Sequence, residues 1–362
     1  MGISREQVVE VLRTVIDPEL HKDIVSLGML KDFQIEGNKV TVEVTLTTPA
    51  CPLKDKITED VKLAFRGRLP QATEIQVKFD AEVKSARPMG QTDRLATVKN
   101  VIAVGSGKGG VGKSTVAVNL ALALQQEGAK TGLLDADIYG PSIPIMCGVT
   151  EGEKPKIVSG NRIAPIVRYG MPLMSMGFLM GEGDAVVWRG PMLAKMLQQF
   201  LEQVEWGDLD YLVLDLPPGT GDVQISLSQM IPISGAVVVT TPQDVALADV
   251  KRAIKMFQMT QVPILGIVEN MSGFSCPHCK ETTPIFGKSG DAAKYKALGV
   301  DLLGTLPLEL ETRVGGDAGD PIVVREPKSD QTRRFHELAR QIAAHQSVQN
   351  FSKGLELPSL QH

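Results

Sequence analysis

The chain has 362 residues, of which 43% are hydrophobic and 22% are charged, and its formal net charge is −4. This length allows two to three domains with buried cores and excludes a small scaffold stapled by disulfides or metal ions. The composition argues against wholesale disorder, and the lack of a basic surplus argues against nucleic acid as the main partner.

The N-terminal segment carries Arg5, Glu6 and Glu10, which excludes the apolar core of a secretory signal. No uninterrupted apolar stretch reaches the roughly 18 residues that a membrane-spanning helix needs. We therefore expect a cytoplasmic protein that has no membrane partner.

The first part of the chain predicts a small α+β domain over residues 1–80. Ser4 is a suitable N-cap for an apolar-striped helix that the Asp-Pro-Glu of residues 17–19 ends. Alternating apolar residues predict half-buried strands, and Pro52 opens a second helix. The expected elements are a helix over 4–16, a strand over 40–46, a helix over 52–65 and a strand over 74–79.

Residues 81–97 are polar and lack periodicity, so we expect a linker there. From residue 98 onward, short continuous apolar runs alternate with helical stretches, as in parallel strands buried on both faces. These runs are 101–104, 131–134, 211–214, 236–239, 264–268 and 302–306. They predict a doubly wound α/β domain with a mostly parallel sheet over 98–346, followed by a mobile tail over 347–362.

A glycine-rich segment directly after the first of these runs satisfies the pattern G-x-x-x-x-G-K-[ST] and leads into an apolar-periodic helix. Such a loop directs backbone N–H groups at phosphates, while Lys113 reaches the phosphate oxygens and the Ser114 hydroxyl can bind Mg²⁺. The expected nucleotide-binding residues are Gly107, Lys108, Gly109, Gly110, Val111, Gly112, Lys113, Ser114 and Thr115.

Lys108 is a second lysine early in this loop, and in this setting the sequence resembles the deviant Walker A ATPases, the MinD, ParA and Mrp families. The resemblance implies an ATP-dependent sandwich dimer in which Lys108 contacts phosphate across the interface. Asp137, at the end of a predicted strand, is the candidate for orienting the attacking water. Asp215 corresponds to the Walker B carboxylate that binds Mg²⁺ through water. Asn270 matches the position that contacts adenine, although an asparagine that merely caps the strand is an equal alternative.

Cys276 and Cys279 are separated by two residues and follow the strand expected over 264–268. Two thiolates supply half of a four-ligand site, and a homodimer would supply the other half. A shared [4Fe-4S] cluster, a shared zinc ion and a redox pair are equally compatible with the cysteines alone. His278, between them, is interpretable as a surface residue.

Two further cysteines are isolated in sequence. Cys51 precedes Pro52 at the expected start of a helix, where the helix dipole would lower its thiol pKa, and the alternative is a buried unreactive thiol. Cys147 is expected in the core. The methionine-rich stretch Met171, Met174, Met176 and Met180 is also expected to fill the core.

The small domain with Asp17-Pro18-Glu19 and Thr47-Thr48-Pro49-Ala50-Cys51-Pro52, followed by this ATPase with Cys-Pro-His-Cys, resembles the Mrp/ApbC family of iron-sulfur cluster carriers. The stretches 135–142 and Trp188-Arg189-Gly190-Pro191-Met192 extend the resemblance. It implies ATP, Mg²⁺ and a [4Fe-4S] cluster held by Cys276 and Cys279 of two subunits. It further implies ATP hydrolysis, apo iron-sulfur proteins as recipients, and scaffold proteins as donors.

Two other functions stay open on the sequence. One is a positioning ATPase of the MinD or ParA type. The C-terminal segment argues against a MinD-like membrane helix, because it is only weakly basic and is interrupted by glycine and proline. The other is a zinc-stabilised ATPase scaffold without cluster transfer.

Overall fold

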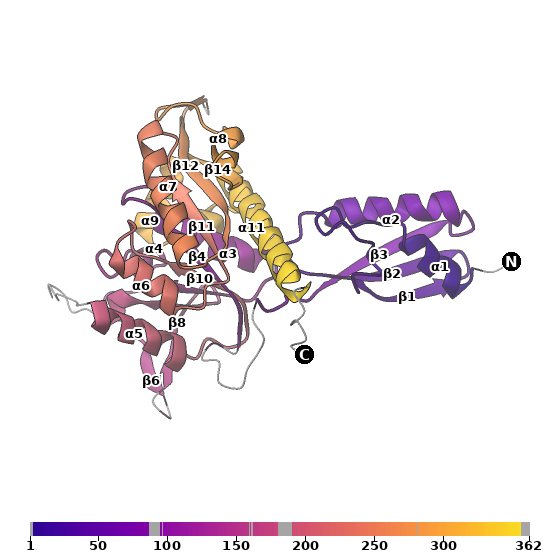
Figure 1. Ribbon diagram of the computed structural model, residues 1–362, viewed down its shortest axis with the longest axis horizontal. Coiled ribbons are helices and arrows are strands. Elements are labelled where there is room, and N and C mark those ends of the chain that lie inside the picture. Colours follow the sequence, from indigo (N-terminus) through magenta and orange to yellow (C-terminus); the bar gives the residue numbers. More distant parts are fainter. Residues whose placement is uncertain are drawn as a thin grey trace, which may run out of the picture. The chain divides into compact units, whose positions relative to one another are not determined.

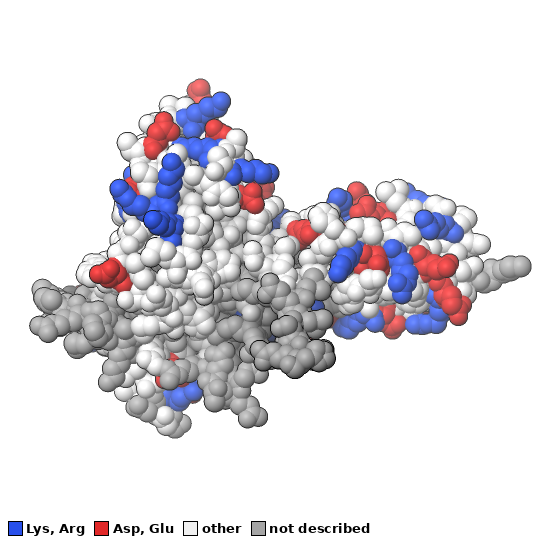
Figure 2. Space-filling model, viewed as in Figure 1, with Lys and Arg blue, Asp and Glu red and all other residues white. Residues whose placement is uncertain are grey.

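The computed structural model describes residues 3–86, 95, 97–158, 160, 162–179, 190–279 and 281–355. The chain divides into two compact units, one of residues up to 84 with those from 343 onward, and one of residues 85–342 (Figure 1). On the face shown in Figure 2, the coloured Lys and Arg side chains are interspersed with Asp and Glu, as the small net charge leads one to expect.

The first unit is an α+β fold, as predicted. Its elements are α1 (Arg5–Leu12), β1 (Leu30–Glu36), β2 (Lys39–Leu46), α2 (Lys54–Arg68) and β3 (Glu74–Ala81). Strand β2 lies in the centre of the sheet, antiparallel to β1 and parallel to β3. Helix α2 makes the crossover that two parallel neighbours require. The Ser4 hydroxyl accepts a hydrogen bond from the Gln7 N–H, and the Gln7 side chain accepts one from the Ser4 N–H, so Ser4 caps α1 as expected.

Two details of this unit differ from the sequence prediction. Helix α1 ends at Leu12 rather than at residue 16, because the N–H groups of Thr14 and Val15 bond to carbonyls three residues back and Ile16 then pairs with Asp23. Strand β1 was not predicted. Phe33 is its one buried residue, so β1 lacks the apolar alternation by which a half-buried strand is identified.

The second unit is built on a mostly parallel sheet. Within the described residues, nine strands join in the order β13-β12-β11-β4-β10-β5-β9-β8, with β14 also paired to β12. The strands are β4 (Val98–Gly105), β5 (Thr131–Asp135), β8 (Ile166–Arg168), β9 (Met171–Ser175), β10 (Leu209–Asp215), β11 (Gly235–Thr240), β12 (Ile264–Ser275), β13 (Thr282–Thr283) and β14 (Leu302–Leu308). All six predicted strands are confirmed, while β8, β9 and β13 were not predicted. A separate hairpin joins β6 (Lys156–Val158) and β7 (Arg162–Ala164).

Helices cover both faces of this sheet. The helices after β4 are α3 (Lys113–Gln126), α4 (Ile143–Met146), η2 (Met176–Leu179), α5 (Gly190–Gln203), α6 (Asp222–Met230), α7 (Asp244–Met259), α8 (Ala292–Lys296), α9 (Leu310–Ala318), α10 (Ile322–Arg325) and α11 (Asp330–Leu355), of which α11 belongs to this unit only up to residue 342. Strand β4 is connected through α3 to β5, which lies in one direction along the strand order. Strand β10 is connected through α6 to β11, which lies in the opposite direction. Right-handed crossovers therefore place α3 opposite α6 and α7, which lie together on the near face in Figure 1. The doubly wound arrangement is confirmed.

Helix α11 runs through Leu355, so residues 347–355 are helical where the sequence predicts a mobile tail. The side chains of Met171, Met174 and Met176 are fully buried, which confirms that they fill the core. Met180, Trp188 and Arg189 lie outside the described residues. No described helix combines the length and the apolar character that a membrane crossing requires.

Candidate functional site

The glycine-rich loop connects β4 to α3, as the motif requires. Gly112 is the N-cap of α3 and adopts a left-handed backbone with φ of 80°. A Cβ on Gly112 would lie 2.2 Å from Nδ2 of Asn270, and a Cβ on Gly107 would lie 2.3 Å from the carbonyl oxygen of Asp249 on α7. Glycine is thus required at both positions by the close approach of other parts of the chain.

The structure brings four of the predicted site residues together at the carboxyl edge of the sheet. Lys113 Nζ lies 2.7 Å from Oδ1 of Asp215 and 3.6 Å from Oδ2 of Asp137. The Ser114 hydroxyl donates a 2.6 Å hydrogen bond to Oδ2 of Asp215. One lysine therefore neutralises part of a carboxylate cluster whose oxygens also meet a hydroxyl.

A third carboxylate, Asp135, lies beneath this cluster and was not predicted as a site residue. Asp135 and Asp215 are neighbours on paired parallel strands, and both side chains are completely buried. Burial and the nearby Asp215 raise the pKa of Asp135 to about 8, and burial likewise raises the pKa of Asp215. Burial therefore favours the protonated forms of these two carboxyl groups, and a bound divalent cation would favour the charged forms.

Asp135 positions the loop that carries Asp137. Its Oδ1 accepts a hydrogen bond from the Asp137 N–H, and its Oδ2 accepts one from the Ser175 hydroxyl at the end of β9. The Ser175 hydroxyl in turn accepts a hydrogen bond from the Gly177 N–H. The sequence signal for this role was available, because Asp135 ends a predicted strand next to Asp137.

We predict that the stability of the nucleotide-free protein declines between pH 5 and pH 8 and that Asp135→Asn reduces this decline. A carboxyl whose folded-state pKa is raised to about 8 stabilises the fold below its unfolded pKa and loses that contribution as pH rises toward 8. The slope for one such group is at most about 1.4 kcal/mol per pH unit. Urea unfolding across this pH range measures it. Asp244→Asn, at a fully exposed carboxylate, is the control, and an unchanged slope in Asp135→Asn would contradict the prediction.

A cavity of about 240 Å³ opens around the loop, and we call it the loop cavity. Lys108, Lys113, Ser114 and Asp137 are among the residues that line it. Pro218, from the segment after β10, completes one wall. The Gly219 N–H donates to the Ser106 carbonyl at 3.0 Å, so this segment is tied directly to the glycine-rich loop.

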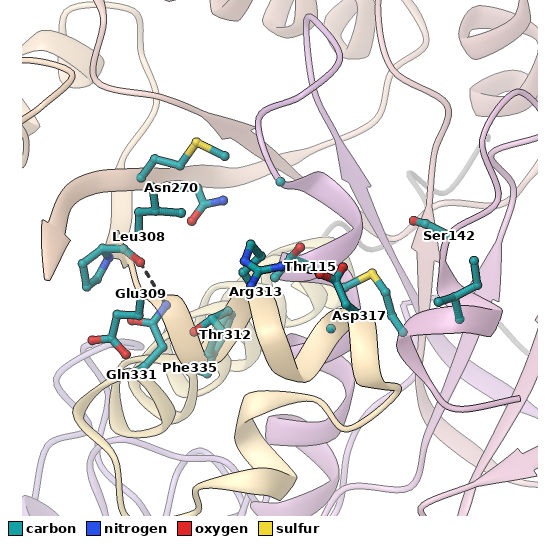
Figure 3. Close-up of a pocket in the computed structure, with 16 residues that line it drawn as sticks. Thr115, Ser142, Asn270, Leu308, Glu309, Thr312, Arg313, Asp317, Gln331 and Phe335 are labelled. Carbon is teal, nitrogen blue, oxygen red and sulfur yellow. Dashed lines mark hydrogen bonds and ion pairs between the residues drawn. The ribbon is translucent and has the colours of Figure 1, made fainter. Parts of the chain in front are cut away.

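A second pocket of about 360 Å³ adjoins the loop cavity, and we call it the side pocket (Figure 3). The two share Gly112, Thr115, Ser142 and Met146 as lining residues. Asn270 lies in the wall of the side pocket, as Figure 3 shows, and its Nδ2 donates a 2.9 Å hydrogen bond to the Val111 carbonyl. Asn270 thus connects the end of the β12 core segment to the glycine-rich loop.

Most of the other residues of the side pocket were not predicted. They come from the end of β14, from α9 and from the start of α11, and they include Pro307, Leu308, Glu309, Thr312, Arg313, Gln331 and Phe335. The signal that could have found the first of them is the predicted strand over 302–306, because its carboxyl end must reach the same edge of the sheet.

The cysteine pair lies at the end of the hairpin formed by β12 and β13. Phe274 and Ser275 pair with Thr283 and Thr282, and the Cys276 N–H donates to the Glu281 carbonyl at 3.0 Å. Cys276 is half-buried, whereas Cys279 and His278 are exposed. Across the part of the chain that the structure describes, no three His, Cys, Asp or Glu side chains are placed to hold one metal ion.

The other two cysteines are buried to different extents, and one prediction about them was wrong. Burial raises the pKa of Cys51 to about 11, where the sequence predicted a lowered value. Helix α2 begins at Lys54, and the 3.4 Å hydrogen bond from the Leu53 N–H to the Cys51 sulfur does not offset the burial. Cys147 is fully buried and its pKa is raised to about 12, which confirms it as a core residue.

Comparison with known proteins gives two family matches that together cover most of the chain. Residues 97–343 match the model of the NUBPL iron-transfer P-loop NTPases, and residues 5–79 match that of an iron-sulfur cluster assembly protein. The iron-sulfur cluster carrier protein of Synechocystis is 47% identical over 96% of this chain and 99% of its own length. The protein of the same name from Deinococcus radiodurans is 48% identical over 98% of both chains.

Among solved structures, a nucleotide-binding protein of Archaeoglobus fulgidus in complex with ADP is 38% identical, with a TM-score of 0.58. The match covers 67% of this chain and 94% of that one. With the P-loop geometry and the two family matches, these relatives show that the chain belongs to the NUBPL family of iron-transfer P-loop NTPases.

Proposed function

We propose that two copies of this chain hold one [4Fe-4S] cluster between them and transfer it to apo iron-sulfur proteins in a reaction linked to ATP. Cys276 and Cys279 of each copy would be the cluster ligands. Scaffold proteins would supply the cluster. In this proposal residues 1–80 act as a cluster-assembly domain and residues 81–97 as the linker to the NTPase domain of residues 98–346.

The observation that carries this proposal is the position of the cysteine pair at the accessible end of a hairpin that continues a strand of the NTPase sheet. A cluster with four thiolate ligands needs two more than one pair supplies. A second copy of the chain would supply the two further thiolates. A shared site at exposed positions also suits a cluster that must be released to another protein.

The loop cavity supports ATP and Mg²⁺ as the other ligands. Ser114 and Asp215 present two hard oxygen donors side by side, the ligand type that Mg²⁺ prefers. Mg²⁺ bound there would neutralise charge on the nucleotide phosphates. In this proposal Lys113 binds the phosphates, Asp137 orients the attacking water, and Lys108 contacts the nucleotide of the partner subunit.

The side pocket supports binding of the adenine ring. It continues from the loop cavity past Gly112, and Asn270 lies in its wall. In the nucleotide-free chain Asn270 already hydrogen-bonds the loop through its Nδ2. Its carbonyl oxygen would accept a hydrogen bond from the amino group of adenine.

Anaerobic reconstitution of the full chain with iron and sulfide tests the proposal. We expect about four irons and four acid-labile sulfides per two chains, since a cubane cluster has that composition. The protein mass in solution, measured in parallel, should be that of a dimer. Bound zinc without sulfide would overturn the proposal in favour of a zinc-stabilised scaffold.

A further inference from the structure

The path between the side pocket and the cysteine pair is a single strand, β12. Asn270 lines the pocket, and Cys276 follows six residues later, directly after the same strand ends at Ser275. The backbone of this strand therefore connects the two sites directly. Its geometry along this route is irregular.

A bulge interrupts β12 where the strand leaves the pocket. Asn270 pairs with Leu306 of β14, and the next pair is Phe274 with Leu308. Three residues of β12 thus lie opposite Pro307 alone, and proline has no N–H with which to continue the ladder. The pairing that holds the rest of the strand in place is interrupted here.

Met271, the first residue of the bulge, has a left-handed backbone with φ of 56°. This conformation is unfavourable for a residue with an unbranched apolar side chain, so backbone strain is stored at this position. The half-buried Met271 side chain lines the side pocket. Its Cε lies 3.8 Å from the position that a Cβ on Gly112 would occupy, which places it beside the glycine-rich loop.

The strand is held firmly just before the bulge. Glu269 is 1% exposed, and its carboxylate accepts a 2.6 Å hydrogen bond from the Tyr295 hydroxyl and a 2.7 Å one from the Gly290 N–H. This clamp fixes β12 to the segment that follows the hairpin. Because this clamp holds β12 before the bulge, we expect a displacement at Met271 to be taken up on the far side, where the pairing of Phe274 with Leu308 joins the hairpin to β14.

We propose that Met271 is a positioning residue for the cysteine pair, through which an occupied side pocket changes the placement of Cys276 and Cys279. The inference rests on the proposed binding of nucleotide in this pocket. An adenine ring packed against the Met271 side chain would shift the equilibrium between the strained and a relaxed backbone conformation of Met271. Because the hairpin begins three residues later at Phe274, a change in the Met271 backbone would also move the end of the hairpin that carries the cysteines.

The test compares the alkylation rates of Cys276 and Cys279 in the full-length apo protein with and without saturating Mg-ADP or a non-hydrolysable ATP analogue. Iodoacetamide is the probe, peptide mass spectrometry resolves the sites, and Cys51 is an internal reference outside the NTPase unit. In the wild type we expect nucleotide to change the rate at the pair by roughly five- to thirtyfold, the factor that such backbone strain represents.

Met271→Gly removes the strain, because glycine adopts a left-handed backbone readily, and should bring this ratio close to one. Met271→Asn, with a residue that tolerates the same backbone, is a second variant with the same expected loss. Met271→Leu keeps an apolar side chain and the strain and should retain the wild-type ratio. Gln261→Gly is the matched control, since Gln261 has φ of 57° but precedes β12.

Affinity for labelled ADP, measured on each variant, separates the two proposals. A wild-type protein that binds no nucleotide contradicts the proposed ATP-linked function itself. Wild-type binding without any change in alkylation overturns the role of Met271 alone. The same role is overturned if Met271→Gly keeps the wild-type ratio, or if Gln261→Gly loses it to the same extent.

Discussion

Cys276→Ala is expected to eliminate the iron and sulfide that the reconstituted wild-type protein retains. Each copy would contribute one thiolate instead of two, leaving a dimer with two of the four ligands that a cubane cluster needs. The loss should be nearly complete, because two thiolates cannot hold a cluster that needs four ligands. Iron and sulfide assays with visible absorption spectroscopy measure it.

The matched control for this experiment is His278→Ala. His278 lies between the two cysteines and is exposed, so its removal leaves the thiolates and the hairpin in place. We expect wild-type iron and sulfide content in this variant. Wild-type content in Cys276→Ala would show that the cluster binds elsewhere, and loss in both variants would point to damage to the hairpin.

Lys113→Gln is expected to reduce ATP hydrolysis by on the order of 10²-fold or more, the usual effect of removing a charge-stabilising group from a transition state. Nucleotide-linked cluster transfer should fall with it, whereas anaerobic cluster assembly should persist. The Lys113 ammonium lies among the carboxylates of Asp137 and Asp215. Its loss also leaves buried negative charge unpaired, so a lower unfolding free energy is expected as well.

Lys99→Gln controls for the loss of an ion pair in the same unit. Lys99 Nζ lies 2.8 Å from Asp210 Oδ1 near the start of β4, at the edge of the sheet opposite the glycine-rich loop. We expect little change in hydrolysis or transfer in this variant. Transfer by Lys113→Gln at the wild-type, ATP-stimulated rate would contradict a link between nucleotide and cluster release.

The features predicted correctly from sequence are those whose cause lies within a short segment. The phosphate loop is specified by glycines, a lysine and a serine in one continuous stretch between a buried strand and a helix. The buried parallel strands are apolar on both faces, so each is visible without knowledge of its neighbours. Asp137 and Asp215 could be placed at one edge because all parallel strands of a doubly wound sheet end there.

Features that depend on distant contacts could not be predicted in this way. Strand β1 buries Phe33 alone and is held in its sheet by β2, so its sequence carries little periodicity. The predicted low pKa of Cys51 failed because burial, a property of the folded unit, outweighs the local helix geometry. Helix α1 ends early for a similar reason, since its last turn gives way to the pairing of Ile16 with Asp23.

The sequence by itself determined the P-loop fold, the cysteine pair and the residues that gather at the glycine-rich loop, because each is encoded by local spacing and by the polarity of the sheet. Only the tertiary structure decided the walls of the side pocket, the buried Asp135 beneath the carboxylate cluster and the strained Met271 between pocket and cysteines. These depend on strand register, burial and close approach between segments far apart in the chain. Such quantities exist only once the chain has folded.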